Sequence, residues 1–430
     1  MPKRESVNGK IPSVNSPETF VRKNLNFNFI VGLIDGGFYG LGIGFGSFAA
    51  ILPLFVGHLT NSALLIGLIP AIHGAGWQLP QLLTAGGVSR AKRVKPLVLL
   101  ATIHERVPFL GLAAVAWFLA RMDVSLALAL TFLLLIWQSL GAGFAANPWQ
   151  TMVTKVIPPE LHGTFFGTQS AAFNGLAGVT AIAAGFMLEQ LPSPLDFTLC
   201  FILTFVFFVL SFIVVAQTRE HDTEQPAMDE HPAAFWGHSW DILKRDLNFN
   251  AFLVVRSISQ FAGMAISFYI VYAVKELGMS ESAAGIMTAV LLISQVVFAP
   301  VMGRLGDRWS HRGVMILGGL GAAASALLAW IANSTEWFYP VFLLAAIAIV
   351  AIWTVPIALT VSFAKEHERP LYIGLSNTIS APATILAPIL GGWIADAAGY
   401  HAMFLVSALC GLLMVAALIL FVKEPRKETL

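Results

Sequence analysis

Charged side chains are scarce in this chain. Only 11% of its 430 residues are Asp, Glu, Lys or Arg, and 57% are hydrophobic, whereas a soluble domain carries about 25% charged residues. So few charges cannot cover a water-facing surface, which excludes an ordinary soluble globular protein. Cysteine is almost absent as well. Cys200 and Cys410 both lie in apolar stretches, so we expect packed thiols rather than a disulfide or a metal site.

Other absences narrow the function. The net charge is +1 and the basic residues are scattered, so no nucleic-acid partner is expected. The patterns His-Glu-x-x-His, Gly-x-Ser-x-Gly and Gly-x-x-x-x-Gly-Lys do not occur, which argues against an enzyme, against catalytic residues and against ATP hydrolysis. We expect neither a cofactor nor a metal. The first 24 residues are polar, which predicts no cleavable signal peptide.

Long apolar runs fill most of the chain. A membrane-spanning helix needs about 20 apolar residues, and the sequence contains enough such runs for an all-α membrane protein with twelve transmembrane helices. The predicted spans are 27–56, 62–88, 96–119, 124–150, 164–190, 195–216, 249–274, 282–303, 313–332, 337–362, 371–395 and 401–422.

Lysine and arginine predict the orientation. With both termini in the cytoplasm, 21 of the 25 basic residues fall in cytoplasmic segments, as the positive-inside rule requires. Only Arg121 and Lys275 would lie outside, and Arg106 and Arg256 within the membrane. We therefore expect a multi-pass protein of a bacterial-type plasma (inner) membrane.

Internal repeats indicate two six-helix bundles related by pseudo-symmetry. Leu25-Asn26-Phe27-Asn28 opens the first span and Leu247-Asn248-Phe249-Asn250 opens the seventh. A polar interruption separates the halves, and its second part, 233–247, is predicted to be an amphipathic helix at the membrane surface. The expected organisation is a cytoplasmic tail (1–24), an N-terminal bundle (25–216), a cytoplasmic linker (217–247), a C-terminal bundle (248–422) and a second tail (423–430).

A short charged segment, 303–312, lies between two apolar runs and is predicted to be a cytoplasmic loop. Its spacing Gly-x-Leu-x-Asp-Arg-x-x-x-Arg, with Gly303, Asp307, Arg308 and Arg312, resembles the loop signature of the major facilitator superfamily of secondary transporters. The resemblance implies two bundles that expose a central cavity alternately to each side. It also implies that Asp307 latches the cytoplasmic side by docking near a helix N-terminus, here expected at 163–166.

The first-half copy of this loop departs from the signature. Gly87 stands where Asp307 stands in the second half, so the second-half latch is expected to act alone. The arginine and the Gly-Pro pair that antiporters of this family often carry in helices four and five are also missing; Trp137 occupies the arginine position. These departures weaken the case for export.

Ionisable residues occur deep within predicted spans. Asp35 is about ten residues into the first helix, roughly 15 Å from its cytoplasmic end; Glu105 and Arg106 are equally deep in the third, and His73 in the second. Each buried charge costs about 2.5–3.5 kcal/mol, so these groups should pair or line a wet route. Neighbouring helical residues point about 100° apart, so we expect Glu105 and Arg106 to pair with the Asp35 or His73 faces rather than with each other. Burial favours the protonated form of a carboxylate, and a nearby arginine favours the ionised form. If opening of the cavity changed the distance between them, the carboxylate would carry a proton.

Aromatic and amide side chains within the spans are candidates for lining a substrate cavity, because such surfaces suit amphipathic or lipophilic solutes. Arg256 could bind an anionic group. The candidate lining residues are Tyr39, Trp77, Gln78, Asn147, Trp149, Arg256, Tyr269, Trp353 and Asn377.

The sequence thus predicts a monomeric secondary transporter in a lipid bilayer, which couples protons to the export of a small lipophilic or amphipathic organic molecule. Two alternatives remain open. One is a symporter or uniporter for a polar nutrient such as a sugar or nucleoside. The other is a transporter-like sensor without flux.

Overall fold

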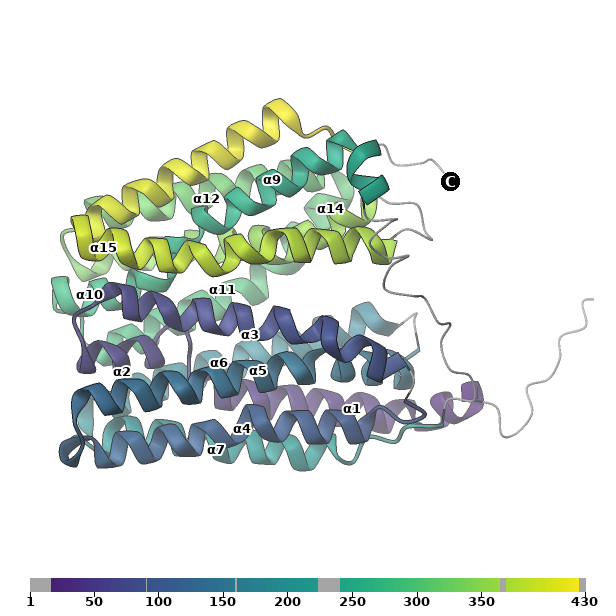
Figure 1. Cartoon of the computed structure of the whole chain (residues 1–430), viewed down its shortest axis with the longest axis horizontal. Helices are drawn as coiled ribbons and strands as arrows, with labels where there is room; N and C mark the ends of the chain where they lie inside the picture. Colours follow the sequence, from purple (N-terminus) through teal and green to yellow (C-terminus); the bar gives the residue numbers. More distant parts are fainter. Residues whose placement is uncertain (1–16, 90, 159–160, 223–239, 364–368, 425–430) are drawn as a thin grey trace, which may run out of the picture.

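The computed structural model describes residues 17–89, 91–158, 161–222, 240–363 and 369–424. Helices make up most of the described part of the chain, and no strand occurs in it. The long helices run roughly parallel to one another in two groups, α1–α7 and α9–α15 (Figure 1). We call the end where α1 begins and α15 finishes the inner end, and the opposite end the outer end.

The helices follow one another with short connections. The α-helices of the first group are α1 (Pro17–Phe45), α2 (Ile51–Leu59), α3 (Ala63–Ser89), α4 (Lys95–Phe118), α5 (Val124–Val156), α6 (His162–Gln190) and α7 (Leu195–Val215). Those of the second group are α9 (Leu247–Ala262), α10 (Tyr269–Leu277), α11 (Glu281–Arg308), α12 (His311–Ile331), α13 (Phe338–Ile349), α14 (Val355–Phe363) and α15 (Arg369–Phe421).

Eleven of these stretches are long and apolar enough to cross a membrane. The last of them, Tyr372–Phe421, contains two helices joined at Gly399, whose φ of 85° is easily reached only by glycine. Two predicted spans, 371–395 and 401–422, correspond to these helices. The prediction of an all-α membrane protein with about twelve crossings is therefore confirmed.

Three predicted spans are interrupted. The first breaks between α1 and α2, and the seventh breaks between α9 and α10 around a short 3₁₀ segment, Met264–Phe268. The tenth contains a π-helical turn, Val350–Thr354, between α13 and α14. The prediction of continuous helices in these three spans was wrong, because a long apolar run does not indicate where a helix bends. Helix α1 begins at Pro17, within the predicted tail 1–24.

Part of the linker lies outside the described residues, including most of the predicted amphipathic helix at 233–247. Its last part, 240–245, is helical. There Trp240 is exposed and Ile242 is buried against the second group.

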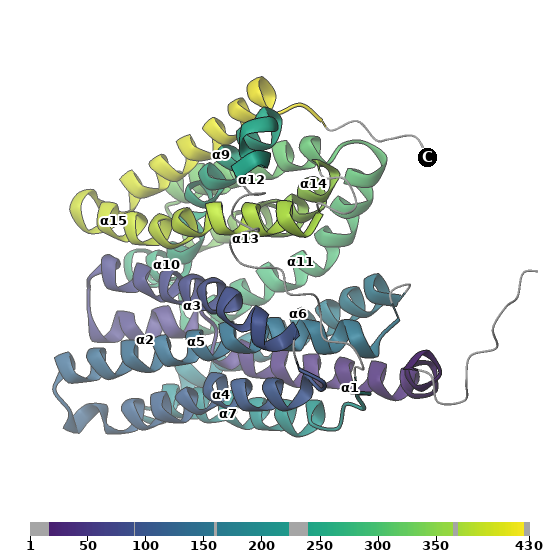
Figure 2. The ribbon, with the colours of Figure 1, turned by 45° about the vertical axis from the view of Figure 1, so that its right-hand side comes forward.

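The two groups meet along α3 with α15 and α6 with α11 (Figure 2). Glycines allow these helices to touch at the outer end. A Cβ on Gly67 of α3 would lie 2.3 Å from the Pro388 carbonyl oxygen, and one on Gly185 of α6 would lie 2.6 Å from the Glu281 carbonyl oxygen. Nearer the inner end of α6, a Cβ on Gly175 or Gly167 would meet no atom within 4 Å. The contact between groups is therefore tightest at the outer end.

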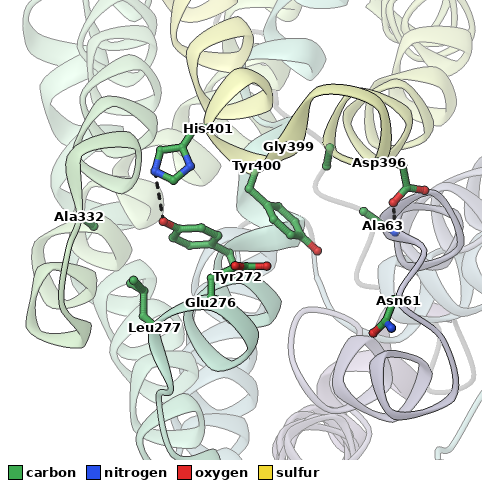
Figure 3. A pocket seen from close by; sticks show the side chains of 11 residues that line it. Asn61, Ala63, Tyr272, Glu276, Leu277, Ala332, Asp396, Gly399, Tyr400 and His401 are labelled. Carbon is green, nitrogen blue, oxygen red and sulfur yellow. Dashed lines mark hydrogen bonds between the residues drawn. The ribbon is translucent and has the colours of Figure 1, made fainter.

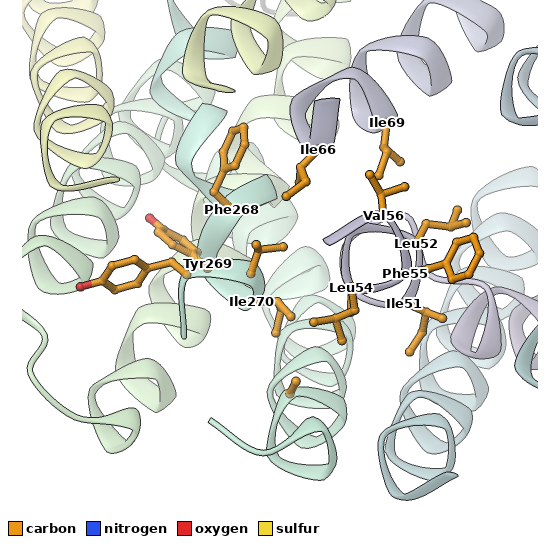
Figure 4. Close-up of a cluster of buried hydrophobic side chains, with 14 of the residues drawn as sticks. Ile51, Leu52, Leu54, Phe55, Val56, Ile66, Ile69, Phe268, Tyr269 and Ile270 are labelled. Carbon is orange, nitrogen blue, oxygen red and sulfur yellow. The ribbon is translucent and has the colours of Figure 1, made fainter. Parts of the chain in front are cut away.

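An apolar core continues across the two groups at this outer end. Leu52, Phe55 and Val56 of α2 pack with Ile66 and Ile69 of α3 in one buried cluster. Phe268, Tyr269 and Ile270 of the second group belong to the same cluster (Figure 4). Burial of these apolar side chains stabilises the contact between the two groups. Both interrupted spans, α1–α2 and α9–α10, contribute to it.

A repeated clamp at the inner end corrects the register of the internal repeat. The Asn28 side chain bonds both the N–H and the carbonyl of Arg219, each at 2.9 Å. In the second group the Asn248 side chain bonds the N–H and carbonyl of Lys423 at 2.8 and 2.9 Å. Asn28 therefore corresponds to Asn248, two residues away from the register that the Leu-Asn-Phe-Asn strings predicted.

The residue after each clamped position caps the N-terminus of another helix. Glu220 accepts the N–H groups of Val94 and Lys95 at 2.7 and 2.9 Å, before and at the start of α4. Glu424 accepts those of His311 and Arg312 at 3.1 and 3.2 Å, at the start of α12. Such carboxylates satisfy otherwise unpaired donors and the helix dipole, so the same device closes each six-crossing unit.

The crossing of α3 and α5 gives a first testable prediction. A Cβ on Gly143 would lie 1.9 Å from the carbonyl oxygen of Gly76, so Gly143→Ala must push the two helices apart at an expected cost of about 1–3 kcal/mol. We expect a lower melting temperature for the purified protein. Gly175→Ala is the matched control, because its Cβ meets open space; an equal loss in both variants would contradict this packing.

Candidate functional site

A chain of buried polar groups joins α1, α4 and α7 inside the first group. The Tyr39 hydroxyl donates a hydrogen bond to Glu105, and Glu105 lies 3.5 Å from Nη1 of Arg106. Nη2 of Arg106 donates to the Ser211 hydroxyl at 3.0 Å, and this hydroxyl donates to Asp35 at 2.6 Å. The five side chains form one relay, which we call the Asp35–Tyr39 relay.

The geometry corrects one expectation about this cluster. Adjacent positions on a helix point apart, but the long Arg106 side chain turns back to contact Glu105, which an argument from helix angles alone missed. Arg106 is further fixed by carbonyl oxygens, donating to Phe208 at 2.8 Å and Thr102 at 3.0 Å. The guanidinium therefore links Glu105 directly, and Asp35 through Ser211.

The relay is sealed from its surroundings and its charges do not balance. Asp35 is 7% exposed, and Glu105 and Arg106 are 5% exposed. Among the described residues, the helices of the first group enclose these three side chains. Two carboxylates share one guanidinium, so the fully ionised relay would hold one uncompensated negative charge in a region where charge is costly.

The relay lies next to α6, the helix of the first group that contacts α11 of the second group. The Tyr39 ring stacks on Phe208 at 4.6 Å and lies 6.0 Å from Phe173 of α6. Trp149 of α5 also interacts with the Asp35 side chain. Next to Asp35, a Cβ on Gly36 would lie 2.5 Å from Gln169. Residues on either side of Asp35 in α1 therefore pack on α6, and α6 in turn meets α11.

His73 does not join the relay. Its ring stacks on Phe48 at 4.1 Å, and its Nδ1 is buried with no hydrogen-bond partner among the described residues. The expected pairing of His73 with the third helix was wrong, since its side chain points toward the bend after α1.

A second buried charge lies in the other group. Arg256 of α9 is 7% exposed and donates to the Ser376 hydroxyl and, at 2.9 Å, to the Asn377 amide oxygen of α15. Its Nε is buried without a partner in the part of the chain described. Arg256 and Asn377, both predicted for the cavity, thus come together, while Asp35 lies in the opposite group.

The remaining cavity candidates have different environments. Trp77 and Trp353 are exposed at 37% and 48%; Trp353 lies in the π-helical turn, a feature often found at functional sites. Asn147 bonds Thr84 at 3.4 Å, and the buried Gln78 Oε1 has no partner among the described residues. Tyr269 was wrongly placed at the cavity, because it is fully buried.

Tyr269 instead belongs to the interior of the second group, where its hydroxyl bonds Ser325 at 3.0 Å.

The predicted loop 303–312 is largely helical. Helix α11 extends through Gly303 and Asp307 to Arg308, so only Trp309 and Ser310 separate it from α12. The Asp307 side chain lies outside the described residues, and its latch stays a prediction. Arg312 does not point to the first group: it donates to the carbonyls of Leu418 and Ile419, both at 3.0 Å.

A carboxylate latch that the sequence did not reveal occurs at the outer end. Asp396 of α15 accepts hydrogen bonds from the N–H groups of Ala63 and Leu64 at 2.5 and 2.9 Å, and from the Ser62 hydroxyl at 2.8 Å. A side chain of the second group therefore caps the N-terminus of α3 in the first (Figure 3). In the sequence, Asp396 is only a single acidic residue near the end of an apolar run, which does not indicate a partner.

The latch borders a pocket of about 620 Å³ that is lined by both groups. Further links between the groups lie nearby. Lys275 donates to the Thr60 carbonyl at 3.0 Å, and His58 lies 3.2 Å from Glu281. The outer end is therefore held closed by apolar burial and by polar contacts between groups.

Asp396→Asn should loosen this closure. Asparagine lacks the negative charge that the N-terminus of α3 favours, a loss of about 0.3–1 kcal/mol, so the outer-open population should rise roughly two- to five-fold. Maleimide labelling of an Ile66→Cys probe, which is buried in the cluster between the groups, measures this change in membranes when Cys200 and Cys410 are replaced by serine. Asp123→Asn is the control, because Asp123 caps α5 within its own group. Equal labelling in both variants would contradict the latch.

Comparisons with known proteins agree with this architecture. The model of the Major Facilitator Superfamily matches residues 252–430. The tetracycline resistance protein, class H, of Pasteurella multocida is 27% identical over 144 residues, 34% of this chain and 36% of that protein. Multidrug resistance protein 1 of Bacillus subtilis (strain 168) is 26% identical over 153 residues, 36% and 39% of the two chains. The matched stretch thus spans little more than a third of these relatives.

The fold is similar over a much larger part. The nucleoside transporter NupG (D323A mutant) superposes with a TM-score of 0.73 at 12% identity, covering 92% of this chain and all of that one. At that identity the likeness concerns the fold alone. The C-terminal part of the chain, residues 252–430, thus matches the Major Facilitator Superfamily, and the fold of most of the chain is similar to that of a solved transporter.

Proposed function

We propose that this protein is a secondary active transporter that exports lipophilic or amphipathic organic molecules in exchange for protons, by alternating access. The observation that carries this proposal is the buried relay, in which two carboxylates share a single guanidinium. Residues 25–216 and 248–422 would be the two moving bundles, in a plasma membrane with both termini in the cytoplasm.

The charge imbalance supports proton uptake. Burial disfavours the ionised form of a carboxylate, and a neighbouring guanidinium favours it. Arg106 can balance only one of Asp35 and Glu105, so the other is expected to take up a proton when the relay is closed. Asp35 is the better candidate, since its link to Arg106 passes through Ser211 while Glu105 contacts the guanidinium directly.

The position of the relay supports coupling to movement. Asp35 and Tyr39 lie on α1, whereas Glu105 and Arg106 lie on α4 and Ser211 on α7. The α1 helix packs closely on α6, which contacts α11 of the other group. A shift of α1 with α6 would change the Tyr39–Glu105 and Ser211–Asp35 contacts together. The proton affinity of the relay would then differ between the two states, as coupling requires.

Export is supported by the relatives, which are named for resistance to tetracycline and to multiple drugs. Exposed Trp77 and Trp353 would suit apolar parts of a substrate. Members of this family are transporters rather than enzymes, in line with the missing catalytic patterns.

Proteoliposomes with an imposed pH gradient test the proposal. Three probes of different charge serve as substrates: Nile red, carboxyfluorescein and ethidium. We expect at least one of them to move against the direction of proton flow. Movement together with protons would establish the uptake symporter instead, and saturable binding without flux would establish the sensor. Liposomes without protein correct for passive leakage.

A further inference from the structure

Arg256 is a buried cation without an acidic partner in the described part of the chain. Its two hydrogen-bond partners, Ser376 and Asn377, are both neutral. A guanidinium has five N–H donors, and the Nε of Arg256 is buried with no acceptor among the described residues. A charge in such a place is unfavourable unless something balances it. Arg106 shows the contrast, because carbonyl oxygens, a hydroxyl and a carboxylate surround it.

The neighbours of Arg256 are polar and come from three helices. Ser376 also hydrogen-bonds Thr360 of α14 at 3.2 Å, so three helices hold the guanidinium and its partners. One turn further along α9, Gln260 is 8% exposed and bonded to the Arg256 carbonyl. The Asn377 side chain is exposed, so the guanidinium is reached past an amide that can rotate away. α15 faces α3 of the first group, across the contact between groups.

We propose that Arg256, with Ser376 and Asn377, binds the anionic group of the substrate, so that the transported molecules are amphipathic organic anions. This inference rests on the proposed transport function and narrows its substrate class. A carboxylate, sulfonate or phosphate would satisfy the unpartnered donor and the charge at once, and planar two-pronged pairing favours a carboxylate or phosphate. The apolar part of the molecule would extend from Asn377 toward the contact between groups.

Matched naphthalene compounds test the assignment by calorimetric titration of the purified full-length protein. The anions are 1-naphthoate, 1-naphthalenesulfonate and 1-naphthyl phosphate; 1-naphthylmethylammonium is the cation and 1-naphthalenemethanol the neutral compound. We expect at least one anion to bind about ten-fold or more tightly than the neutral compound. The anion preferred identifies the headgroup.

Variants connect the preference to Arg256. Arg256→Gln should lose the preference for anions while binding 1-naphthalenemethanol as before, and Arg256→Lys should keep part of it. Arg121→Gln, which removes an exposed arginine at the outer end, should leave it unchanged. Unaltered binding of the neutral compound shows that the variant is folded. No preference for any anion in the natural protein, including no binding at all, would overturn the inference, as would a preference that survives in Arg256→Gln.

Failure of this inference is distinguishable from failure of the proposed function. Proton-driven flux of Nile red without any anion preference would retain transport and reject the anion site. Arg256-dependent binding of an anion without any proton-driven flux would retain the site and reject the transporter.

Discussion

Asp35→Asn is expected to abolish transport driven by a proton gradient while leaving exchange of substrate for substrate intact. The asparagine keeps the size of the side chain and can still accept from Ser211, which now donates to Asp35 at 2.6 Å. It cannot take up or release a proton, so the relay loses its titratable step. Flux of the substrate identified in proteoliposomes, with and without a pH gradient, measures both activities.

A second buried aspartate provides the control for this variant. Asp196, at the outer end of α7, is 8% exposed and lies outside the relay. Asp196→Asn should therefore retain proton-driven flux. If Asp35→Asn transports against a gradient as well as the natural protein does, Asp35 has no part in coupling.

Arg106→Gln is expected to have the largest effect on stability. It leaves Asp35 and Glu105 buried without their shared cation, and removal of one partner of a buried ion pair costs about 3–5 kcal/mol. The folded variant should hold both carboxylates protonated, which the unfolded chain does not require at neutral pH. Its stability should therefore rise as the pH falls. Melting temperatures of detergent-purified protein across the acidic range measure this.

Two further variants separate charge from packing in this experiment. Adding Glu105→Gln to Arg106→Gln should restore much of the stability, because it removes one of the stranded acids. Arg256→Gln should cost little, since no acid of the described residues is paired with that arginine. A loss of stability in Arg106→Gln that neither acidic pH nor Glu105→Gln relieves would show that the charges are not its cause.

Much of the fold followed from the sequence because a bilayer imposes simple rules. Scarce charge and repeated apolar runs predicted the helices, and the asymmetry of basic residues predicted an even number of crossings. The breaks after Phe45 and Ala262 were missed, because a few small residues such as Gly46, Ser47 and Gly263 do not interrupt the long apolar runs. Local hydropathy does not report where the packing of neighbouring helices bends a span.

The site was predictable only in part. Burying Asp35, Glu105 and Arg106 is costly, and that cost alone singled them out. Ser211, which links two of them, could not be found, since it is 176 residues from Asp35 in the sequence and serine is common in membrane helices. Asp396 was missed for the same reason: its partners at the start of α3 are more than 330 residues away.

Infrared spectroscopy of the reconstituted protein tests the central claim, that the relay holds a proton on one of its two carboxylates. The carbonyl stretch of a protonated, buried carboxylic acid is separate from that of ionised carboxylates. The natural protein should show this band at neutral pH, and Asp35→Asn should weaken or remove it while Asp196→Asn does not. Absence of the band in the natural protein would contradict proton storage by these residues. So would a band that is as strong in Asp35→Asn and in Glu105→Gln as in the natural protein.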